Sequence, residues 1–328
     1  MRKFVGSGLG SLDAFSLVEA DLPAPSEGEI RIRIEATALG FVDGLIAQGR
    51  YQIRPTLPYV PGGEIAGTVH ATGPAVDTVS VGDRVVTWQF GGGLAEYVVV
   101  DANAVDKIPA GLAATAAAAM LVDYQTAHYA LFDRARLREG ETVLVLGAAG
   151  GVGSAAVQLA ARAGAHVIAA ASTDRKREVA RQLGAHATID SDSGAPDVRS
   201  QIKATAPGGA VNVIFDPVGG DKFEAMFRSL AKDGRHLVVG FAAGGIPSLP
   251  ANLPLLKSAA LVGVDVRHFL AARPAEARRT RMALFERVAS GALQAPRVTS
   301  FPLERAGEAL AATMRRDKAG KVVVLPSY

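Results

Sequence analysis

The feature that most constrains this chain is a glycine-rich turn between two apolar runs, over residues 142–161. Residues 142–146 are rich in β-branched side chains and predict a buried strand, while the alanine-rich run from Gly151 predicts a helix. The glycines of the turn are Gly147, Gly150, Gly151 and Gly153. Without a Cβ, these residues let a pyrophosphate approach the N–H groups at the helix N-terminus, where the helix dipole favours an anion. The segment therefore predicts a dinucleotide site.

The surroundings of the turn support this interpretation more than the glycines themselves. The pattern G-x-G-x-x-G is not met literally, because Ala148 stands at its first glycine. A second apolar run, residues 166–170, follows at the spacing that a βαβ unit requires. The alternative is an ordinary strand-to-helix turn whose glycines only permit close packing.

The end of the second predicted strand favours NADP over NAD. NAD sites usually place an acidic residue about twenty residues after the glycines to bind the ribose 2′-hydroxyl, but residues 169–173 contain no carboxylate. Asp174 comes one position later and is interpreted as the N-cap of the next helix. The residues suited to bind a 2′-phosphate are Ser172, Arg175, Lys176 and Arg177. The alternative is that this basic turn is only a solvated helix face.

Length and composition exclude several classes of protein. A chain of 328 residues is long enough for two cores. No apolar run has the length of a membrane span, and the N-terminus lacks the pattern of a signal peptide, so we expect a cytoplasmic protein without a membrane partner. A net charge of +3 with few aromatic residues argues against nucleic acid as a partner. The basic run from Arg273 to Arg287 is interpreted as the wet face of an amphipathic helix.

The sequence offers few residues for a metal site and none for thiol chemistry. Cysteine is absent, which excludes disulfides, a cysteine nucleophile and thiolate zinc sites. The six histidines, at positions 70, 128, 166, 186, 236 and 268, are not spaced as ligand pairs. We therefore predict no metal site.

The pattern of the elements changes along the chain. Up to about residue 100, short alternating runs such as 30–34, 65–69 and 84–88 predict an antiparallel sheet or small barrel. Residues 113–130 predict one long helix. From the glycine turn onward, strands at 211–215, 235–240 and 259–264 alternate with helices, including one at 221–230, which is typical of a parallel sheet covered on both faces. A last strand, 321–325, is expected to return to the first domain.

Eight motifs in one order make the whole chain resemble a known family. They lie at residues 58–67 (PYVPGGEIAG), 81–85 (VGDRV), 92–97 (GGLAEY), 126–129 (TAHY), 146–153 (LGAAGGVG), 183–185 (LGA), 216–220 (DPVGG) and 320–324 (GKVVV). With them the chain resembles the zinc-free quinone oxidoreductase branch of the medium-chain dehydrogenase/reductase superfamily, the group that includes zeta-crystallin.

The resemblance implies an α/β protein with a GroES-like β-barrel domain and a Rossmann domain, a doubly wound parallel sheet, with an active cleft between them. The expected limits are 1–120 for the first domain, 121–265 for the Rossmann domain and 266–328 for the return to the first. The resemblance also implies homodimers and NADP(H) as cofactor. The implied cofactor contacts are Thr126, Gly150, Gly151, Val152, Gly153, Ser172, Lys176, Phe241, Val264 and Lys321.

Three positions depart from the family pattern. Gly40 stands where members commonly have an asparagine, and Leu45 where they have a tyrosine, whereas Asp43 and Tyr51 are retained. These two changes widen the nicotinamide side of the cleft and leave the identity of the substrate open. Ser191 replaces a tyrosine that contacts the cofactor in many members, which weakens one contact near the 2′-phosphate.

The chemistry expected of such a chain is hydride transfer to a conjugated acceptor. Reducing a quinone or an α,β-unsaturated carbonyl gives a phenolate or enolate with delocalised charge, and a phenol has a pKa of about 10, so no metal is needed. We expect Phe41, Tyr51 and Trp88 to line the acceptor site, with Tyr51 as a weak catalytic candidate and Asp43 in a structural hydrogen bond. The alternatives are a double-bond reductase for enoyl thioesters or alkenals, and a sensor that binds NADPH without turnover.

Overall fold

The computed structural model describes residues 1–192, 194–195 and 197–327, which form two compact units. The first unit contains Met1–Val122 and the C-terminal segment from Arg281, and the second is Asp123–Thr280. The second unit thus continues past the limit of 265 expected from the sequence. Tyr129 explains part of this extension, because its ring stacks on Phe269 with centroids 4.5 Å apart.

The first unit is built on a mostly antiparallel sheet in which strands from both ends of the chain are neighbours. The strand order is β14-β15-β3-β4-β5-β7, and β6 also pairs with β3. The strands of this sheet are β3 (Glu29–Leu39), β4 (Glu64–Thr72), β5 (Arg84–Trp88), β6 (Tyr97–Asp101), β7 (Val105–Lys107), β14 (Val298–Pro302) and β15 (Lys321–Leu325). The remaining elements are the hairpin β1 (Arg2–Gly6) and β2 (Phe15–Glu19) and the helices α1 (Phe41–Ala47), α2 (Ala114–Met120) and α11 (Ala306–Thr313).

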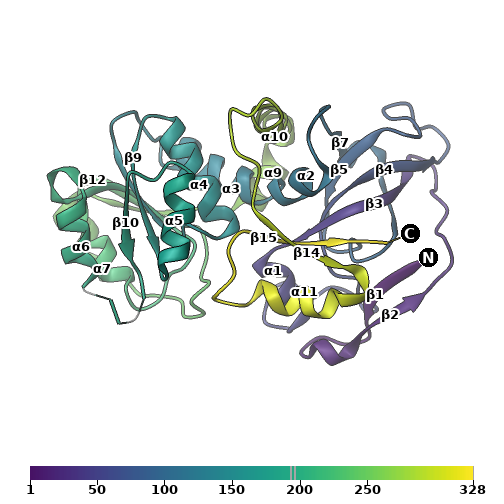
Figure 1. Ribbon diagram of the computed structural model, residues 1–328, viewed down its shortest axis with the longest axis horizontal. Coiled ribbons are helices and arrows are strands. Elements are labelled where there is room, and N and C mark those ends of the chain that lie inside the picture. Colours follow the sequence, from purple (N-terminus) through teal and green to yellow (C-terminus); the bar gives the residue numbers. More distant parts are fainter. Residues whose placement is uncertain (193, 196, 328) are drawn as a thin grey trace. The chain divides into compact units, whose positions relative to one another are not determined.

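Alternation along β3 explains how this sheet forms its core. Ile30, Ile32 and Ile34 are fully buried, whereas the arginines between them are not. The C-terminal strand β15 pairs antiparallel with β3 of the same sheet, Val323 facing Ala38. Figure 1 shows the yellow β15 beside the purple β3.

The second unit is a doubly wound sheet of six parallel strands in the order β10-β9-β8-β11-β12-β13. Its strands are β8 (Thr142–Leu146), β9 (His166–Ala171), β10 (Ala187–Asp190), β11 (Val211–Asp216), β12 (Leu230–Val238) and β13 (Ala260–Gly263). Its helices are α3 (Asp123–His128), α4 (Gly151–Arg162), α5 (Asp174–Gln182), α6 (Val198–Thr205), α7 (Phe223–Phe227), α8 (Asn252–Lys257), α9 (Val266–Ala272) and α10 (Pro274–Ala289), which runs on into the first unit. Figure 1 shows α4 and α5 on one side of the strands and α6 and α7 on the other. The predicted fold class is therefore confirmed.

Two helix predictions differ from the structure. The long helix expected over 113–130 is broken between α2 and α3, because the N–H of Val122 donates to the Glu64 carboxylate at 2.9 Å instead of to a helical carbonyl. The helix expected over 221–230 is shorter, because Leu230 already belongs to β12 and faces Val211. Within the described ranges no helix has the length and apolarity that crossing a bilayer requires. The cytoplasmic location stays a prediction.

Candidate functional site

The turn between β8 and α4 has a backbone that only glycine fits. Gly147 has a φ of +57°, in the left-handed region. A Cβ on Gly153 would lie 2.2 Å from the carbonyl oxygen of Gly147, and a Cβ on Gly151 would lie 1.9 Å from Oδ2 of Asp123. Gly147 and Gly153 therefore allow α4 to begin directly against the end of β8, and Gly151 allows it to lie against α3.

This geometry fits a dinucleotide pyrophosphate. The first turn of α4 presents the N–H groups of Gly151, Val152 and Gly153, which have no acceptor within their own helix because of their position. The turn lies at the carboxyl end of β8, and the strand order reverses between β8 and β11. Ligands of open α/β sheets bind at such a reversal, and an anion at a helix N-terminus is stabilised by the dipole.

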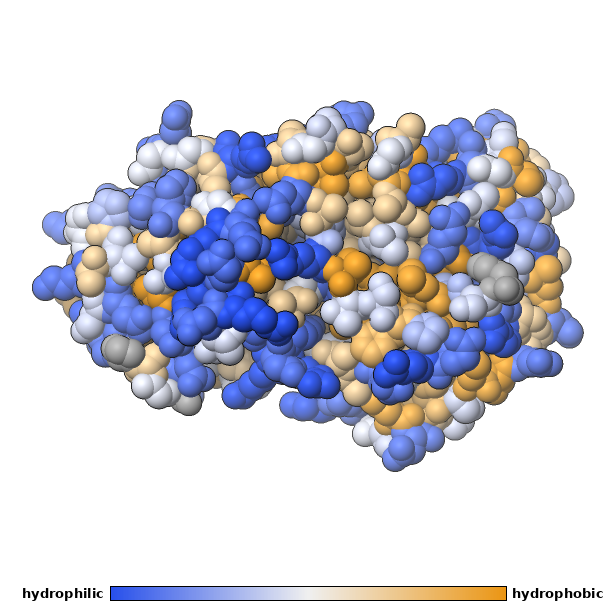
Figure 2. Space-filling model, viewed as in Figure 1, coloured by the Kyte–Doolittle hydropathy of each residue, from blue (hydrophilic) through white to orange (hydrophobic). Residues whose placement is uncertain are grey.

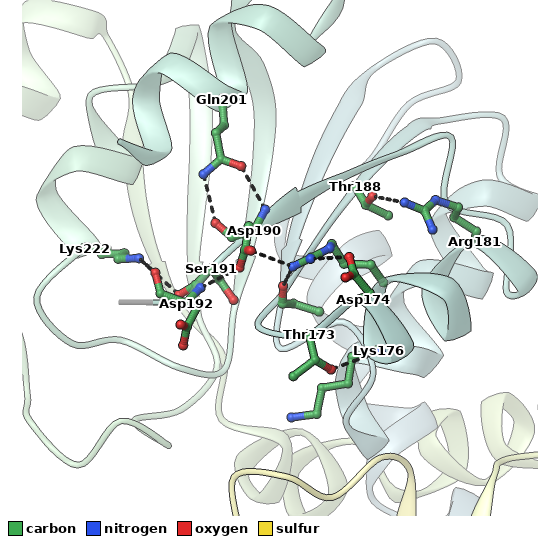
Figure 3. A network of polar contacts seen from close by, with 12 residues as sticks. Thr173, Asp174, Lys176, Arg181, Thr188, Asp190, Ser191, Asp192, Gln201 and Lys222 are labelled. Carbon is green, nitrogen blue, oxygen red and sulfur yellow. Dashed lines mark hydrogen bonds and ion pairs between the residues drawn. The ribbon is translucent and has the colours of Figure 1, made fainter. Parts of the chain in front are cut away.

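The second end of the candidate nucleotide site is the first turn of α5, which follows β9. Thr173 is the N-cap, and its hydroxyl accepts the N–H of Lys176 at 3.3 Å, so the expectation that Asp174 caps this helix was wrong by one residue. Ser172 lies in the connection just before it. The body of Lys176 is buried, and Figure 3 shows its side chain extending away from Asp174 and Asp190. In the view of Figure 2, strongly hydrophilic surface covers the region of α5.

Arg177 is engaged in the structure itself. Its guanidinium donates to the carbonyl oxygen of Ala171 at 2.9 Å and forms ion pairs with Asp174 at 2.6 Å and with Asp190 at 3.0 Å. Its charge is thus balanced by two carboxylates, and it ties α5 to β9 and β10. Arg177 is therefore held by two carboxylates, and the Lys176 side chain points away from both of them (Figure 3).

Lys222 contacts the two residues that directly follow β10. The ammonium of Lys222 donates to the carbonyl oxygens of Ser191, at 3.1 Å, and Asp192, at 2.7 Å. Figure 3 shows these contacts together with the Asp190 to Gln201 pair. Lys222 thus binds the main chain of Ser191, the residue that departs from the family pattern.

The other predicted cofactor residues of the second unit lie on α3 and near the ends of β12 and β13. Thr126 is a buried residue of α3, and Val264 follows β13, its N–H donating to the carbonyl of Val238 at 3.0 Å. Phe241 follows β12 and is partly exposed. The adjacent Ala242 N–H donates to the carbonyl oxygen of Pro217 at 3.1 Å, which joins this loop to the loop after β11.

Lys321 lies in the first unit, at the first residue of β15, close to the first residue of β4, Glu64. The register places Glu64 opposite Ala38 and Trp88, and Val322 opposite Leu39. The ammonium of Lys321 forms an ion pair with Glu64 at 2.7 Å, and both side chains are almost completely buried. A Cβ on Gly40 would lie 3.7 Å from this ammonium and 3.6 Å from Oδ2 of Asp43. Because residue 40 is a glycine, the backbone lies open beside all three charged groups.

Asp43, Glu64 and Lys321 form a charged cluster beside Gly40. The structural hydrogen bond predicted for it is confirmed, because its Oδ2 accepts the N–H of Gly40 at 2.7 Å. Burial raises the pKa of Asp43, although the Gly40 N–H and the positive charge of Lys321 act in the opposite direction. Burial also raises the pKa of Tyr59, and the nearby Asp43 carboxylate adds to that shift.

The three predicted acceptor residues occupy separate places in the first unit. Phe41 begins α1, two residues before Asp43, and Trp88 ends β5 opposite Glu64. The Trp88 ring packs edge-on against Phe90, with centroids 5.0 Å apart. Tyr51 is half-buried and packs against the apolar cluster that contains Leu39 and Tyr59. Phe41 and Trp88 therefore belong to the elements that carry the charged cluster.

Glu64, Asp216 and His236 are buried polar residues to which the sequence pattern assigned no role. Glu64 and Asp216 lie inside two of the family motifs, at the first residue of β4 and the last residue of β11, and this position is the signal that would have singled them out. His236 carries no such signal, because it sits inside the apolar run of β12. In the described part of the chain, no three His, Asp or Glu side chains are grouped as metal ligands.

Comparison with known proteins supplies an independent observation. Residues 26–110 match the family described as alcohol dehydrogenase GroES-like domain, and residues 151–283 match the family described as zinc-binding dehydrogenase. The chain is 37% identical over 318 residues to quinone oxidoreductase-like protein 2 of Bos taurus, covering 94% of this chain and 88% of that protein.

Two solved structures share the complete architecture. Escherichia coli quinone oxidoreductase complexed with NADPH superposes with a TM-score of 0.89 at 27% identity, covering 99% of this chain and all of that one. The CurK enoyl reductase superposes with a TM-score of 0.87 at 26% identity, covering 99% of both chains.

Proposed function

Because this chain belongs to the medium-chain dehydrogenase/reductase superfamily, we propose that it reduces a quinone, or a related α,β-unsaturated carbonyl, with NADPH as the hydride donor. The observation that carries the proposal is the glycine turn before α4 combined with Lys176 in the first turn of α5. The first fits a pyrophosphate, and the second offers a cation where the adenosine ribose would lie.

NADPH supplies the hydride, and the residues of this chain bind and orient the dinucleotide. The N–H groups of Gly151, Val152 and Gly153 hold the pyrophosphate, while Lys176, with Ser172 beside it, binds the 2′-phosphate. Thr126, Phe241 and Val264 contact the remainder of the cofactor. The relative from Escherichia coli, which is complexed with NADPH, supports this assignment.

The proposed acceptor is conjugated because such an acceptor needs no Lewis acid. Hydride addition to a quinone produces a phenolate whose charge is spread over the ring, and solvent water protonates it. Phe41 and Trp88 are proposed to pack against the flat acceptor, and Tyr51 to donate a hydrogen bond to its carbonyl. Lys321, whose charge Glu64 balances, is proposed to contact the cofactor, as the family resemblance implies. The reaction is proposed to be independent of zinc.

A second candidate is the reduction of a carbon–carbon double bond in an enoyl thioester or alkenal. The likeness to the CurK enoyl reductase favours it. This reaction needs the same hydride donor and, in addition, a proton for the α-carbon of the product.

The test is the rate of NADPH oxidation with a panel of acceptors. Quinones should accelerate oxidation strongly over the rate without acceptor, and enones less. Faster turnover of enoyl thioesters than of quinones would establish the double-bond reductase instead. NADPH binding without turnover of any acceptor would contradict both and indicate a sensor.

We also propose that two copies of the chain pair along β13. This strand is at the edge of the six-stranded sheet, and edge strands with apolar side chains favour pairing with another chain. Leu261 (46% exposed) lies in β13 itself, and Leu255 (78%) and Leu256 (70%) are exposed in α8, which directly precedes β13 in the chain. A twofold axis beside β13 would cover the same surface on both copies and make one continuous sheet.

A further inference from the structure

A buried aspartate at the end of β11 holds the loop that follows it. Oδ1 of Asp216 accepts the N–H groups of Val218 and Gly219, both at 2.8 Å. Its other oxygen, Oδ2, lies 2.9 Å from Nε2 of His236 in the neighbouring strand β12. The two side chains are 1% and 0% exposed, so water does not replace these contacts.

The loop that Asp216 holds is joined to the loop after β12. The main-chain oxygen of Asp216 accepts the N–H of Val239 at 2.9 Å, and that of Val218 accepts the N–H of Ala243 at 2.9 Å. A Cβ placed on Gly219 would lie 3.1 Å from the ring of Phe241. A movement of Asp216 therefore displaces both loops and the Phe241 ring.

The same loop contacts the glycine turn of the candidate nucleotide site. A Cβ on Gly147 would lie 3.3 Å from Cγ2 of Val218. The loop thus lies at the reversal of strand order between β8 and β11, across which a dinucleotide binds. Lys176 is on the β9 side of that reversal and fits the adenosine half, so the loops after β11 and β12 face the nicotinamide half.

We propose that His236 is a positioning residue for the nicotinamide half of NADPH, an inference that rests on the proposed cofactor binding. Because its partner is a carboxylate, the hydrogen is assigned to Nε2, which donates to Asp216; in the described residues Nδ1 has no hydrogen-bond partner. The imidazole packs against Phe223 and Phe227 of α7, at centroid distances of 4.2 and 6.0 Å.

The physical reason is the satisfaction of a buried carboxylate. Oδ1 of Asp216 binds the loop, and Oδ2 needs a donor, since a buried acceptor of this charge is costly when unpaired. His236 supplies that donor from β12 and so completes the hydrogen bonds of the carboxylate. Without it, Asp216 gains by turning away from the loop, and Val218, Gly219 and Phe241 lose their fixed positions.

The experiment compares two probes by calorimetry on the full chain. NADPH occupies both halves of the site, whereas adenosine 2′,5′-bisphosphate occupies only the adenosine half. His236→Phe keeps a ring between the phenylalanines and removes the donor, and His236→Gln keeps a donor at about the position of Nε2. Phe223→Leu is the control, because it loosens the packing of the imidazole and leaves the hydrogen bond.

The inference predicts that His236→Phe weakens NADPH binding about tenfold or more and changes bisphosphate binding less than twofold. His236→Gln restores most of the NADPH affinity, and Phe223→Leu lowers Tm with NADPH affinity unchanged. In the unaltered chain, the NMR signal of the His236 ring nitrogen shifts on adding NADPH and not on adding the bisphosphate, a result that does not depend on any variant folding.

Two results would overturn the inference. One is wild-type NADPH affinity in folded His236→Phe, and the other is an equal loss of affinity for both probes, which indicates general unfolding. An unaltered chain that binds neither probe refutes the proposed function itself, and so is distinct from a failure of His236 alone.

Discussion

At the scale of single residues, two adjacent cations differ in the carboxylates that surround them. Lys176 and Arg177 follow one another in the first turn of α5. Asp174 and Asp190 balance the charge of Arg177, whereas the Lys176 side chain extends away from both (Figure 3). The sequence offered both residues for the 2′-phosphate, and only their surroundings separate them.

Replacing Lys176 by alanine is expected to lower kcat/KM for NADPH about 10- to 100-fold, because a hydrogen bond to a charged group contributes roughly 1.5–3 kcal/mol. The value for NADH, which lacks the phosphate, should stay unchanged. Initial rates with one quinone measure both. Arg181→Ala is the matched control, since Arg181 lies on the same helix in an exposed ion pair with Glu178. Equal losses for both cofactors would contradict the assigned role.

The raised pKa of Asp43 predicts a dependence of stability on pH. The folded chain holds the Asp43 proton more tightly than the unfolded chain, so this residue makes the free energy of unfolding fall as pH rises from the ordinary aspartate pKa of about 3.9 to its raised value. In Asp43→Asn the free energy of unfolding does not fall with pH for this reason, because asparagine does not titrate. The side-chain oxygen of the asparagine still accepts the Gly40 N–H. Urea unfolding at pH 4 and pH 7 should show the variant gaining on the wild type at the higher pH. A gain at the lower pH would reverse the sign and refute the argument.

At the scale of elements, the contact between β8 and α4 depends on the absence of one Cβ. In Gly153→Ala the added methyl would overlap the Gly147 carbonyl oxygen, so α4 must move away from the turn. We expect destabilisation of about 1–3 kcal/mol, typical of overpacking, and loss of most NADPH binding. Differential scanning calorimetry and a binding titration measure the two effects. Gly245→Ala, where a Cβ meets no atom within 4 Å, should change neither. An alanine at 153 that leaves both unchanged would show that the close contact is not required.

Much of the element pattern could be predicted from the sequence, since apolar periodicity reports burial directly. β5, β8 and β15 have the predicted limits, because each is a short apolar run that lies within a sheet. The prediction of one helix over 113–130 was wrong because of a tertiary contact. Glu64 accepts the Val122 N–H, and this hydrogen bond interrupts the helix. No local pattern could reveal that contact.

The candidate site likewise contains one part that the sequence could predict and another that it could not. The glycine turn is a local signal, because strand, turn and helix follow each other in the sequence. The ion pair of Lys321 with Glu64 and the contact of His236 with Asp216 join separate strands, and only the register of the sheets brings them together. Sequence reasoning placed Lys321 at the cofactor and did not foresee Glu64 as its partner.

At the scale of the whole molecule, the exposed apolar edge at β13 predicts a dimer. Light scattering should give twice the 33.9 kDa of one chain. Leu255→Glu combined with Leu256→Glu should convert the dimer to a monomer, because two carboxylates per copy would have to lose their water at the interface. Val81→Glu, which changes an exposed valine in the other unit, serves as the control. A monomeric wild type, or a dimer that survives both substitutions, would remove the basis for pairing along β13.

The central claim concerns the second unit, whose glycine turn and Lys176 are assigned to one dinucleotide. The most direct test is calorimetric titration of the unaltered chain with NADPH and, separately, with NADH. The account predicts one site per chain with NADPH bound at least tenfold more tightly than NADH. Absence of binding by either nucleotide, or equal affinity for both, would contradict it.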